Sequence, residues 1–426
     1  MAYGRPAHIR SHRRAGSRRR PRRIAPWISV VIVSALVLSG LVVGYQQLLA
    51  RACSGQVTAR VVAAPSIAQP LDRLATAWLA SEPSTRDGTC ARVLIESRDS
   101  AEVAGLLAAG WNKRSGEAPD VWVPVSSAWV HKAAASEQAA ALLPDDRPSI
   151  ARSPTVIAMP EPMAEALGWP EPRLGDEEVR WATLVEVSGD DRGWARFDHP
   201  EWGPFRLGMT DPARSTAALH ALTALLDTDD DGEVADDELE GAFRLREAIA
   251  PDVYHETTEQ LLTKLEEAAA ADETAGLRHV SAFPALEYEI LVHNGRNPMI
   301  PLTAVYPADG AAEADFPYLV LRAEWSTDQA RQAAAGFLAF LRGPQAQEEL
   351  RTAGFRGFDQ TTDEGFTSDV GVVGTLAAPA RTVPVPASVT RTIEQWTALT
   401  RSTNVLLLLD VSGTMAADVP GTGQTR

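Results

Sequence analysis

Hydrophobic and polar positions follow a repeated order in the first third of the chain. Residues 57–63, 92–96 and 121–123 are short apolar or alternating runs, and a polar junction and an apolar-periodic segment follow each of them. Alternation with a period of two is typical of a strand, and a period near 3.6 is typical of a helix. The order strand, junction, helix therefore occurs three times. It predicts an α/β fold built on a mostly parallel sheet.

The third junction has the clearest pattern of the three. The apolar run Val121-Trp122-Val123 ends at a proline, and Ser126 and Ser127 then open a predicted helix over residues 127–142. In open α/β sheets ligands lie beyond the carboxyl ends of strands, where helix N–H groups are free to meet a polar solute. Serine is also a favoured N-cap residue, so helix capping alone remains an alternative interpretation.

A similar junction is predicted around residues 211–216. Asp211 is followed by Pro212, which suits the N-cap and the first position of a helix over residues 213–226. Ser215 and Thr216 would lie in its first turn, where unpaired N–H groups and the helix dipole favour an anion or a polar solute. Simple capping with exposed hydroxyls is again the alternative.

Charge and hydropathy separate the start of the chain from its body. Residues 1–26 contain nine arginines and no acid, so the other 400 residues carry about −25 (−16 minus 9). An acidic body argues against nucleic acid as its partner. Residues 27–45 carry no charge and are bounded by Trp27 and Tyr45, which predicts one membrane-spanning helix. We expect a single-pass protein of the cell membrane with a basic cytoplasmic tail (1–26) and an extracellular body; a cleaved signal peptide is the alternative.

The two cysteines, Cys53 and Cys90, both follow the predicted membrane segment. In an oxidising exterior an isolated pair most simply forms a disulfide. Two thiols without neighbouring histidines make a poor metal site, so we predict a structural bridge between them.

Three segments together indicate a family. Residues 119–129, residues 193–216 with Asp211-Pro212 and Ser215-Thr216, and residues 304–310 resemble bacterial extracellular solute-binding proteins of the type 2 periplasmic-binding-protein fold. The resemblance covers residues 56–357. It implies a first lobe of about 56–159 and 283–357, and a second lobe of about 160–282, which close on a ligand. The implied ligand-binding residues are Ser66, Ser126, Ser127, Thr155, Asp211, Ser215, Thr216, Glu287 and Tyr288.

Residues 227–238 match the twelve-residue EF-hand loop. Acids stand at its first, third and fifth positions, glycine at the sixth and glutamate at the twelfth. We predict a calcium site made by the side chains of Asp227, Asp229, Asp231 and Glu238 and the carbonyl of Glu233. Eight acidic side chains in twelve positions would repel one another strongly without a cation. A solvated acidic turn is the alternative. EF-hands usually pair and no second loop occurs here, so we expect a structural role.

The last segment has a different character. Residues 358–401 are predicted to be a linker and a short helix, and residues 404–415 form an apolar run that ends in Asp410-x-Ser412-x-Thr414. This run resembles the first strand and metal loop of a von Willebrand factor A domain, in which these three residues would face a magnesium ion. The chain stops twelve residues after Thr414. We therefore interpret residues 402–426 as a truncated start of such a domain and expect no working magnesium site, since one strand cannot bury itself alone. The alternative is that the other part of the domain lies on another polypeptide.

The sequence gives no sign of catalysis. It contains no Gly-x-Ser-x-Gly, Walker or His-Glu-x-x-His motif, and the eight histidines are scattered. We expect a non-enzyme: a membrane-anchored extracellular solute-binding protein that captures a small polar or anionic solute between two lobes. The alternative is a cell-surface adhesion or assembly protein that uses the two-lobed body and a metal-dependent von Willebrand A domain to bind protein partners.

Overall fold

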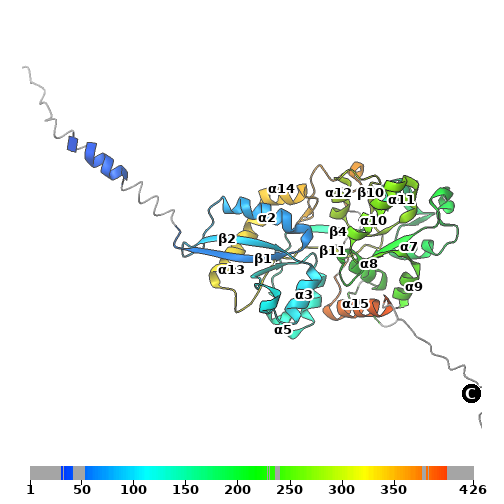
Figure 1. Ribbon diagram of the computed structural model, residues 1–426, viewed down its shortest axis with the longest axis horizontal. Helices are drawn as coiled ribbons and strands as arrows, with labels where there is room; N and C mark the ends of the chain where they lie inside the picture. The colour runs from blue at the N-terminus through cyan, green and yellow to red at the C-terminus, as the bar shows by residue number, and fades with distance from the viewer. Residues whose placement is uncertain are drawn as a thin grey trace, which may run out of the picture. The chain divides into compact units, whose positions relative to one another are not determined.

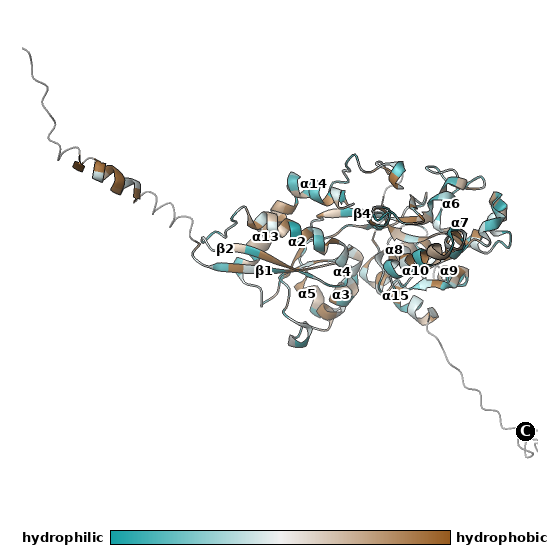
Figure 2. Ribbon diagram, turned by 45° about the horizontal axis from the view of Figure 1, so that its top comes forward, coloured by the Kyte–Doolittle hydropathy of each residue, from teal (hydrophilic) through white to brown (hydrophobic). Residues whose placement is uncertain are grey.

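The computed structural model describes residues 30–31, 33–41, 53–227, 229, 231–235, 240–376, 380–381 and 383–400. The chain divides into two units, residues 1–54 and residues 55–426. In the first unit residues 30–31 and 33–41 are helical and predominantly hydrophobic (Figure 2), while the rest of the predicted membrane segment lies outside the described residues. Within the parts of the chain that are described, no helix is both long enough and apolar enough to cross a bilayer.

Cys53 and Cys90 are disulfide-bonded, as predicted.

The first lobe of the second unit is built on a four-stranded sheet in the order β12-β3-β1-β2. Strand β1 (Gln56–Ala63) is parallel to both β2 (Cys90–Ser97) and β3 (Val121–Val123), which confirms the predicted parallel strands. Strand β12 (Leu319–Val320) is antiparallel to β3. The sequence predicted strands β1, β2 and β3 correctly because successive side chains of a strand face different cores, which leaves a recognisable pattern of apolar residues.

Helices cover both faces of this sheet. On β3, Val121 and Val123 belong to one buried cluster and Trp122 to another, because successive side chains of a strand point to opposite faces. The first cluster holds α2 (Pro65–Leu79), α13 (Asp328–Leu341) and α14 (Pro344–Thr352). The second holds α3 (Ser100–Ala108), α4 (Ser127–Ala134) and α5 (Glu137–Leu142). The single helix predicted over residues 127–142 is therefore divided into α4 and α5.

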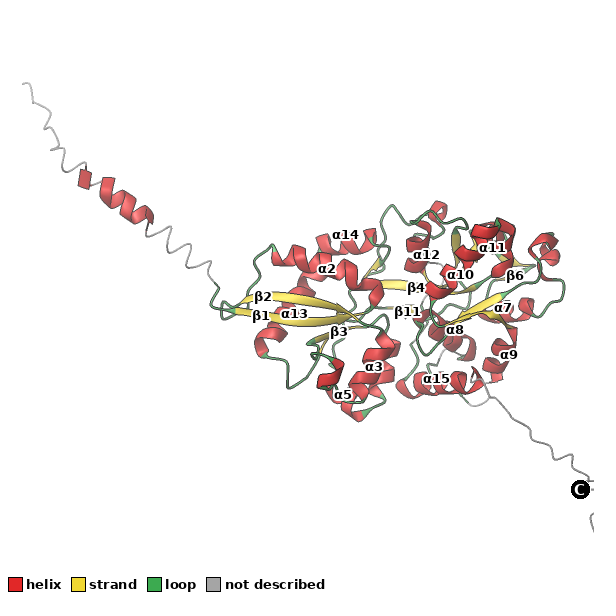
Figure 3. Ribbon diagram, viewed as in Figure 1, coloured by secondary structure: helices red, strands yellow, loops and turns green. Residues whose placement is uncertain are grey.

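Strand β4 (Ala151–Pro160) leads from the first lobe into the second and lies between the two groups of helices (Figures 1 and 3). It pairs antiparallel with four short strands in succession: β13 (Arg356–Gly357), β11 (Glu313–Ala314), β9 (Phe283–Leu286) and β10 (Leu302–Val305). Nine of its ten residues are buried or nearly so, from Ser153 to Pro160 without exception. This burial suits a crossing strand with protein on every side.

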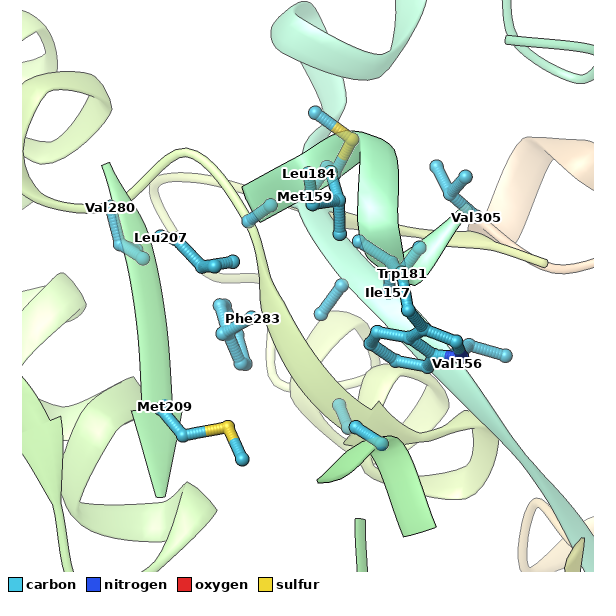
Figure 4. Packing of buried hydrophobic residues seen from close by; sticks show 14 of the residues in the cluster. Val156, Ile157, Met159, Trp181, Leu184, Leu207, Met209, Val280, Phe283 and Val305 are labelled. Carbon is cyan, nitrogen blue, oxygen red and sulfur yellow. The ribbon is translucent and has the colours of Figure 1, made fainter. Parts of the chain in front are cut away.

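The second lobe contains the parallel pair β7 (Leu207–Thr210) and β8 (Ile249–His255) together with β9, β10 and a set of helices. Those helices are α6 (Glu161–Ala166), α7 (Trp181–Ser188), α8 (Thr216–Leu226), α9 (Glu240–Ala248), α10 (Thr258–Ala271), α11 (Glu273–His279) and α12 (Glu287–Asn294). Residues 283–305, which were predicted to belong to the first lobe, therefore pack mainly in the core of the second lobe. The remaining short elements are β5 (Arg173–Leu174), β6 (Glu177–Glu178), and the 3₁₀ turns Lys113–Ser115, Gly193–Phe197, Pro200–Trp202 and Ser368–Val370. Figure 4 shows the packing of the buried core here, with residues Val156, Ile157, Met159, Trp181, Leu184, Leu207, Met209, Val280, Phe283 and Val305.

Two local predictions differ from the structure. Helix α8 begins at Thr216 rather than at residue 213. The segment predicted as a linker also contributes to the core: Phe366 is 6% exposed and Val372 is fully buried. The predicted short helix near the end is α15 (Pro386–Thr400), whose Trp396 is fully buried. Apolar residues in a glycine- and proline-rich segment were not recognised as core because they lack periodicity.

A buried ion pair fixes the returning chain against the crossing strands. Arg356 on β13 donates from Nε and Nη2 to the two carboxylate oxygens of Glu287, at 2.7 and 2.6 Å. The same guanidinium donates to the carbonyls of Val373 and Gly374, and the hydroxyl of Tyr306 donates to Glu287. Because Glu287 and Arg356 are 0% and 1% exposed, these bonds replace the hydration that both charges lose on folding.

Arg356→Met is expected to lower the free energy of unfolding by about 3–5 kcal/mol, because Glu287 would be left charged and buried without its partner. Urea denaturation checks this value. Lys264→Ala is the matched control, since Lys264 pairs with Glu267 on the surface and its loss should cost less than about 1 kcal/mol. The double variant Arg356→Met/Glu287→Gln should recover part of the loss. Equal losses for Arg356→Met and Lys264→Ala would contradict the assignment.

Candidate functional site

A cavity of about 850 Å³ lies between the two lobes. The first lobe contributes the start of α2 with Ser66 and Gln69, and the residues that follow β2 and β3, Asp99 and Val125. The second lobe contributes the starts of α8 and α10 and much of α12. A cavity with walls from both lobes changes its shape whenever the lobes move relative to each other, so this is the place where a ligand would couple to lobe movement.

The starts of α2, α8, α10 and α12 all meet at this cavity. Ser215 is the N-cap of α8 and accepts from the backbone N–H of Ala218 at 3.4 Å, and Thr257 is the N-cap of α10 and accepts from Gln260 at 3.3 Å. Serine and threonine start helices well because the side-chain oxygen accepts from an otherwise unpaired N–H. The partial positive charge at helix N-termini favours anions and hydrogen-bond acceptors.

The charged side chains of the cavity wall are mixed in sign. They are Arg73, Arg214 and Arg296, and Asp99, Glu259, Glu266 and Glu289. Arg73 already pairs with Glu349 at 2.7 Å and Arg214 with Glu256 at 2.5 Å, so part of the positive charge is neutralised by acids outside the wall. This mixture suits a polar ligand with both donors and acceptors better than a simple anion.

Two ionisable groups in the wall have shifted pKa values. Burial raises the pKa of Glu289 to about 7, although its carboxylate accepts from the backbone N–H of Leu286 at 2.8 Å. Burial also raises the pKa of Tyr288 well above its usual range, and the neighbouring charge of Glu289 adds to this shift. The Tyr288 hydroxyl therefore stays protonated, and Glu289 changes charge close to neutral pH.

Four of the nine predicted ligand-binding residues line the cavity. They are Ser66 on α2, Ser215 and Thr216 at the start of α8, and Tyr288 on α12. The other five predicted residues are described as well, and the structure places them outside the cavity wall: Ser126, Ser127, Thr155, Asp211 and Glu287. Glu287 forms the buried ion pair with Arg356. Their role in ligand binding stays a prediction.

His220 on α8 contacts two of these five residues, Ser126 and Thr155. Its Nε2 atom lies 2.9 Å from the Ser126 hydroxyl, and its Nδ1 atom lies 2.8 Å from the Thr155 hydroxyl. The imidazole is fully buried, and burial lowers its pKa to about 3, so it is neutral at ordinary pH. In a neutral imidazole one nitrogen donates and the other accepts, and each hydroxyl can serve either role. Sequence reasoning missed His220, whose one signal was its place within an otherwise apolar helix.

Two further contacts hold α4 in place. One joins it to α8, and the other fixes its first residue, Ser127. The indole Nε1 of Trp129 on α4 donates to the Thr216 hydroxyl at 2.8 Å. Ser127 donates from its backbone N–H and its hydroxyl to Asp315, at 2.6 and 2.5 Å. Asp315 was also missed, because it lies 188 residues from Ser127.

Asp211 is not the N-cap of α8, contrary to the prediction. Its carboxylate accepts from the backbone N–H of Ala213 at 2.9 Å, and its carbonyl accepts from the N–H of Ser215 at 2.7 Å. These bonds close a turn over residues 211–215, and Ser215 then caps the helix. Both residue types cap helices well, so the sequence alone did not distinguish them.

The acidic loop brings three carboxylates close together, while its predicted calcium site stays a prediction. Oxygens of Asp227, Asp229 and Asp231 lie within 4.8 Å of one another. Asp227 is 2% exposed, and its two oxygens accept from the N–H groups of Asp231 and Gly232 at 3.2 Å. Such an oxygen set fits calcium. Glu233 is exposed, and Glu238 lies outside the described residues, as do Asp410, Ser412 and Thr414.

Residues 59–356 match the family described as bacterial extracellular solute-binding protein. The chain belongs to this family. Among curated proteins, one uncharacterised protein from each of two Mycobacterium tuberculosis strains, CDC 1551 / Oshkosh and ATCC 25618 / H37Rv, is 26% identical over 319 residues. The match covers 73% of this chain and 44% of each relative, so this chain spans less than half of their length.

Solved structures show the two-lobed periplasmic-binding-protein fold that the resemblance implied. Each of three examples has a TM-score of 0.50. The sulfate-binding protein SubI of Mycobacterium tuberculosis H37Rv is 14% identical, and the match covers 79% of this chain and 99% of that one. Iron-bound HitA of Pseudomonas aeruginosa is 13% identical, with 81% and 100% covered. AfuA of Actinobacillus pleuropneumoniae, with fructose-6-phosphate bound, is 12% identical, with 81% and 98% covered. The family and these neighbours are binding proteins, in keeping with a non-enzyme.

In this solute-binding protein Glu289→Gln should change how stability depends on pH. The native carboxyl of Glu289 has its pKa raised to about 7, against 4.5 for an ordinary glutamate. The native state therefore binds the proton more tightly, and stability falls as pH rises from about 4.5 to 7. Glutamine removes this loss, so we expect the variant to gain about 1–2 kcal/mol relative to wild type between pH 5 and pH 8. Urea denaturation at both values checks this; parallel profiles would contradict it.

Proposed function

We propose that this chain is an extracellular solute-binding protein that captures a small polar or anionic solute between its two lobes. The observation that carries the proposal is the cavity of about 850 Å³ with walls from both lobes. Its volume suits a small molecule. Ser66, Ser215, Thr216 and Tyr288 offer hydroxyls at the starts of three different helices, which would orient such a solute.

The location of the protein forms part of the same proposal. The family is described as extracellular, and the uncharged segment 27–45 follows a strongly basic tail. We therefore place the body outside the cell and the tail in the cytoplasm, with the segment between them as a single membrane anchor. A transporter that receives the solute is the natural partner for such a protein.

One observation favours a second function, protein adhesion or assembly. The indole of Trp129 contacts Thr216, and His220 joins Ser126 to Thr155, so protein side chains rather than a solute occupy one part of the boundary between the lobes. An aromatic ring that fills part of this boundary would favour a body that binds protein partners through its outer surface. This function would also need a complete metal-dependent von Willebrand A domain, of which residues 402–426 resemble only the start.

A solute panel tests the first function. Thermal melting is measured with sulfate, phosphate, sugars and amino acids, each added separately. A ligand at a hundred times its Kd stabilises by about 2.7 kcal/mol, which should raise Tm by a few degrees. Ser66→Ala and Tyr288→Phe should reduce the shift, because both remove a hydroxyl from the cavity wall.

Ser188→Ala is the matched control for this panel, since the Ser188 hydroxyl bonds to the carbonyl of Val185 away from the cavity. A solute shift of equal size in Ser66→Ala, Tyr288→Phe and wild type would place the solute elsewhere. No shift with any solute would favour the adhesion or assembly function.

We also propose that the acidic loop binds calcium in a structural role. Asp227, Asp229 and Asp231 supply clustered oxygens, and the sequence adds the Glu233 carbonyl and the Glu238 carboxylate to the set. The magnesium role of Asp410, Ser412 and Thr414 would need a complete von Willebrand A domain.

Removing calcium with a chelator should lower Tm, because the clustered carboxylates repel one another without a cation. Asp229→Asn/Asp231→Asn should lose most of the calcium-dependent shift, and titration calorimetry should show the loss of binding directly. Asp190→Asn serves as a control, since Asp190 pairs with Arg192 on the surface of the second lobe. An unchanged calcium shift in the double variant would rule out this site.

A further inference from the structure

The last described segment, residues 383–400, packs against both lobes. It consists of residues 383–385 and α15, and it follows the part of the chain that matches the family, residues 59–356. Val389 and Ile393 are 0% and 7% exposed, and they belong to the same buried cluster as Trp129 of the first lobe. Trp396, one turn further along, is fully buried in the cluster of the second lobe. One helix therefore contributes to the cores of two lobes.

Hydrogen bonds fix both ends of this segment. At its start, the carbonyl of Pro384 lies 2.7 Å from Nδ1 of His131 on α4, in the first lobe. Near its end, the indole Nε1 of Trp396 donates to the hydroxyl of Tyr254 on β8, in the second lobe, at 3.0 Å. The segment thus bonds to one element on each side of the boundary.

A third set of bonds attaches the segment to the acidic loop of the second lobe. The N–H of Val385 donates to the carbonyl of Gly232 at 2.9 Å, and the N–H of Val234 donates to the Ser388 hydroxyl at 3.1 Å. Arg391 donates to the carbonyl of Val234 at 3.0 Å. The backbone of residues 232–234 is therefore held by the same helix that packs on α4.

These contacts lie along one edge of the boundary between the lobes. In Figure 1 helix α15 lies beside α9 at the lower side of the body, where α3 and α5 also lie, and α2, α12 and α14 lie at the upper side. The cavity is lined by α2, α12, the residue after α14 and the starts of α8 and α10, and none of residues 383–400 lines it. The Trp129–Thr216 bond joins α4 to α8, the helices that α15 contacts.

We propose that residues 383–400 act as a strap that pins the two lobes together along the edge formed by α4, α8 and α9. Opening of the cavity then pivots about this edge instead of separating the lobes evenly. The strap does not rest on the proposed function, because its effect on the lobes is measured without any solute.

The test uses spin labels on the full chain in detergent micelles. Exposed Glu137 on α5 and Glu247 on α9 are replaced by cysteine and labelled, and double electron–electron resonance measures the distance between the lobes at the strap edge. Ile393→Asp places a charge in the contact with the first lobe. The matched control is Gln395→Asp, which introduces the same charge on the exposed side of the same helix.

With Ile393→Asp we expect a longer and broader distance distribution, together with amide exchange in α15 that is faster by at least about tenfold. Gln395→Asp should resemble wild type in both measurements. A cooperative thermal melt for both variants distinguishes lobe separation from unfolding. Fast exchange in α15 with an unchanged distance distribution would overturn the proposal, because the released helix would then not be holding the lobes.

A milder variant keeps the test decisive if Ile393→Asp does not fold. Ser388→Ala/Arg391→Ala removes two of the bonds to the acidic loop and leaves the apolar contacts in place. We expect the same two changes at smaller size, with both measured against Gln395→Asp. Wild-type distances in this variant, despite faster exchange in α15, would equally overturn the strap.

Discussion

A single fully buried imidazole, that of His220, holds three elements in fixed positions relative to one another. His220 comes from α8, Ser126 from the N-cap of α4, and Thr155 from the crossing strand β4. Because burial keeps the ring neutral, each nitrogen needs a partner of the right kind, and a shift of any one element would leave a buried polar atom unpaired. The Ser126 hydroxyl also caps α4, accepting from the N–H of Ala128 at 3.1 Å, so the position of α4 and of Trp129 depends on the same contact.

The sequence predicted the parts of this arrangement that are local. Strands β1 to β3 were found because alternating residues face two cores, and the hydroxyls at helix starts were found because capping is a matter of a few residues. What escaped prediction is how those hydroxyls are used. Ser126 bonds to a residue 94 positions away and Ser127 to one 188 positions away, and nothing in a local pattern distinguishes a hydroxyl that meets a solute from one that meets a distant side chain. The start of α8 was misplaced for a local reason, since Asp211 and Ser215 are both good caps.

The acidic loop and the C-terminal helix depend on each other more than either sequence pattern suggests. An EF-hand-like loop is ordinarily considered with the two helices that flank it, here α8 and α9. In this protein the backbone of residues 232–234 also bonds to Val385, Ser388 and Arg391, and Arg381 donates to the carbonyl of Ala224 at 2.7 Å at the end of α8. A cation in the loop would therefore stabilise a contact that reaches the first lobe. The wall of the cavity, in contrast, is built from the starts of helices and keeps its mixed charge independently of the loop.

The position of the segment after residue 356 has a practical consequence for anyone who expresses this body alone. A fragment cut where the family match ends would lack the carbonyls of Val373 and Gly374, which accept from the Arg356 guanidinium. It would also uncover the apolar surfaces beneath Phe366, Val372 and Trp396, all of which are buried in the whole chain. Exposed apolar surface of this kind promotes aggregation. A soluble fragment should extend to Thr400, so that residues 357–400 cover these apolar surfaces.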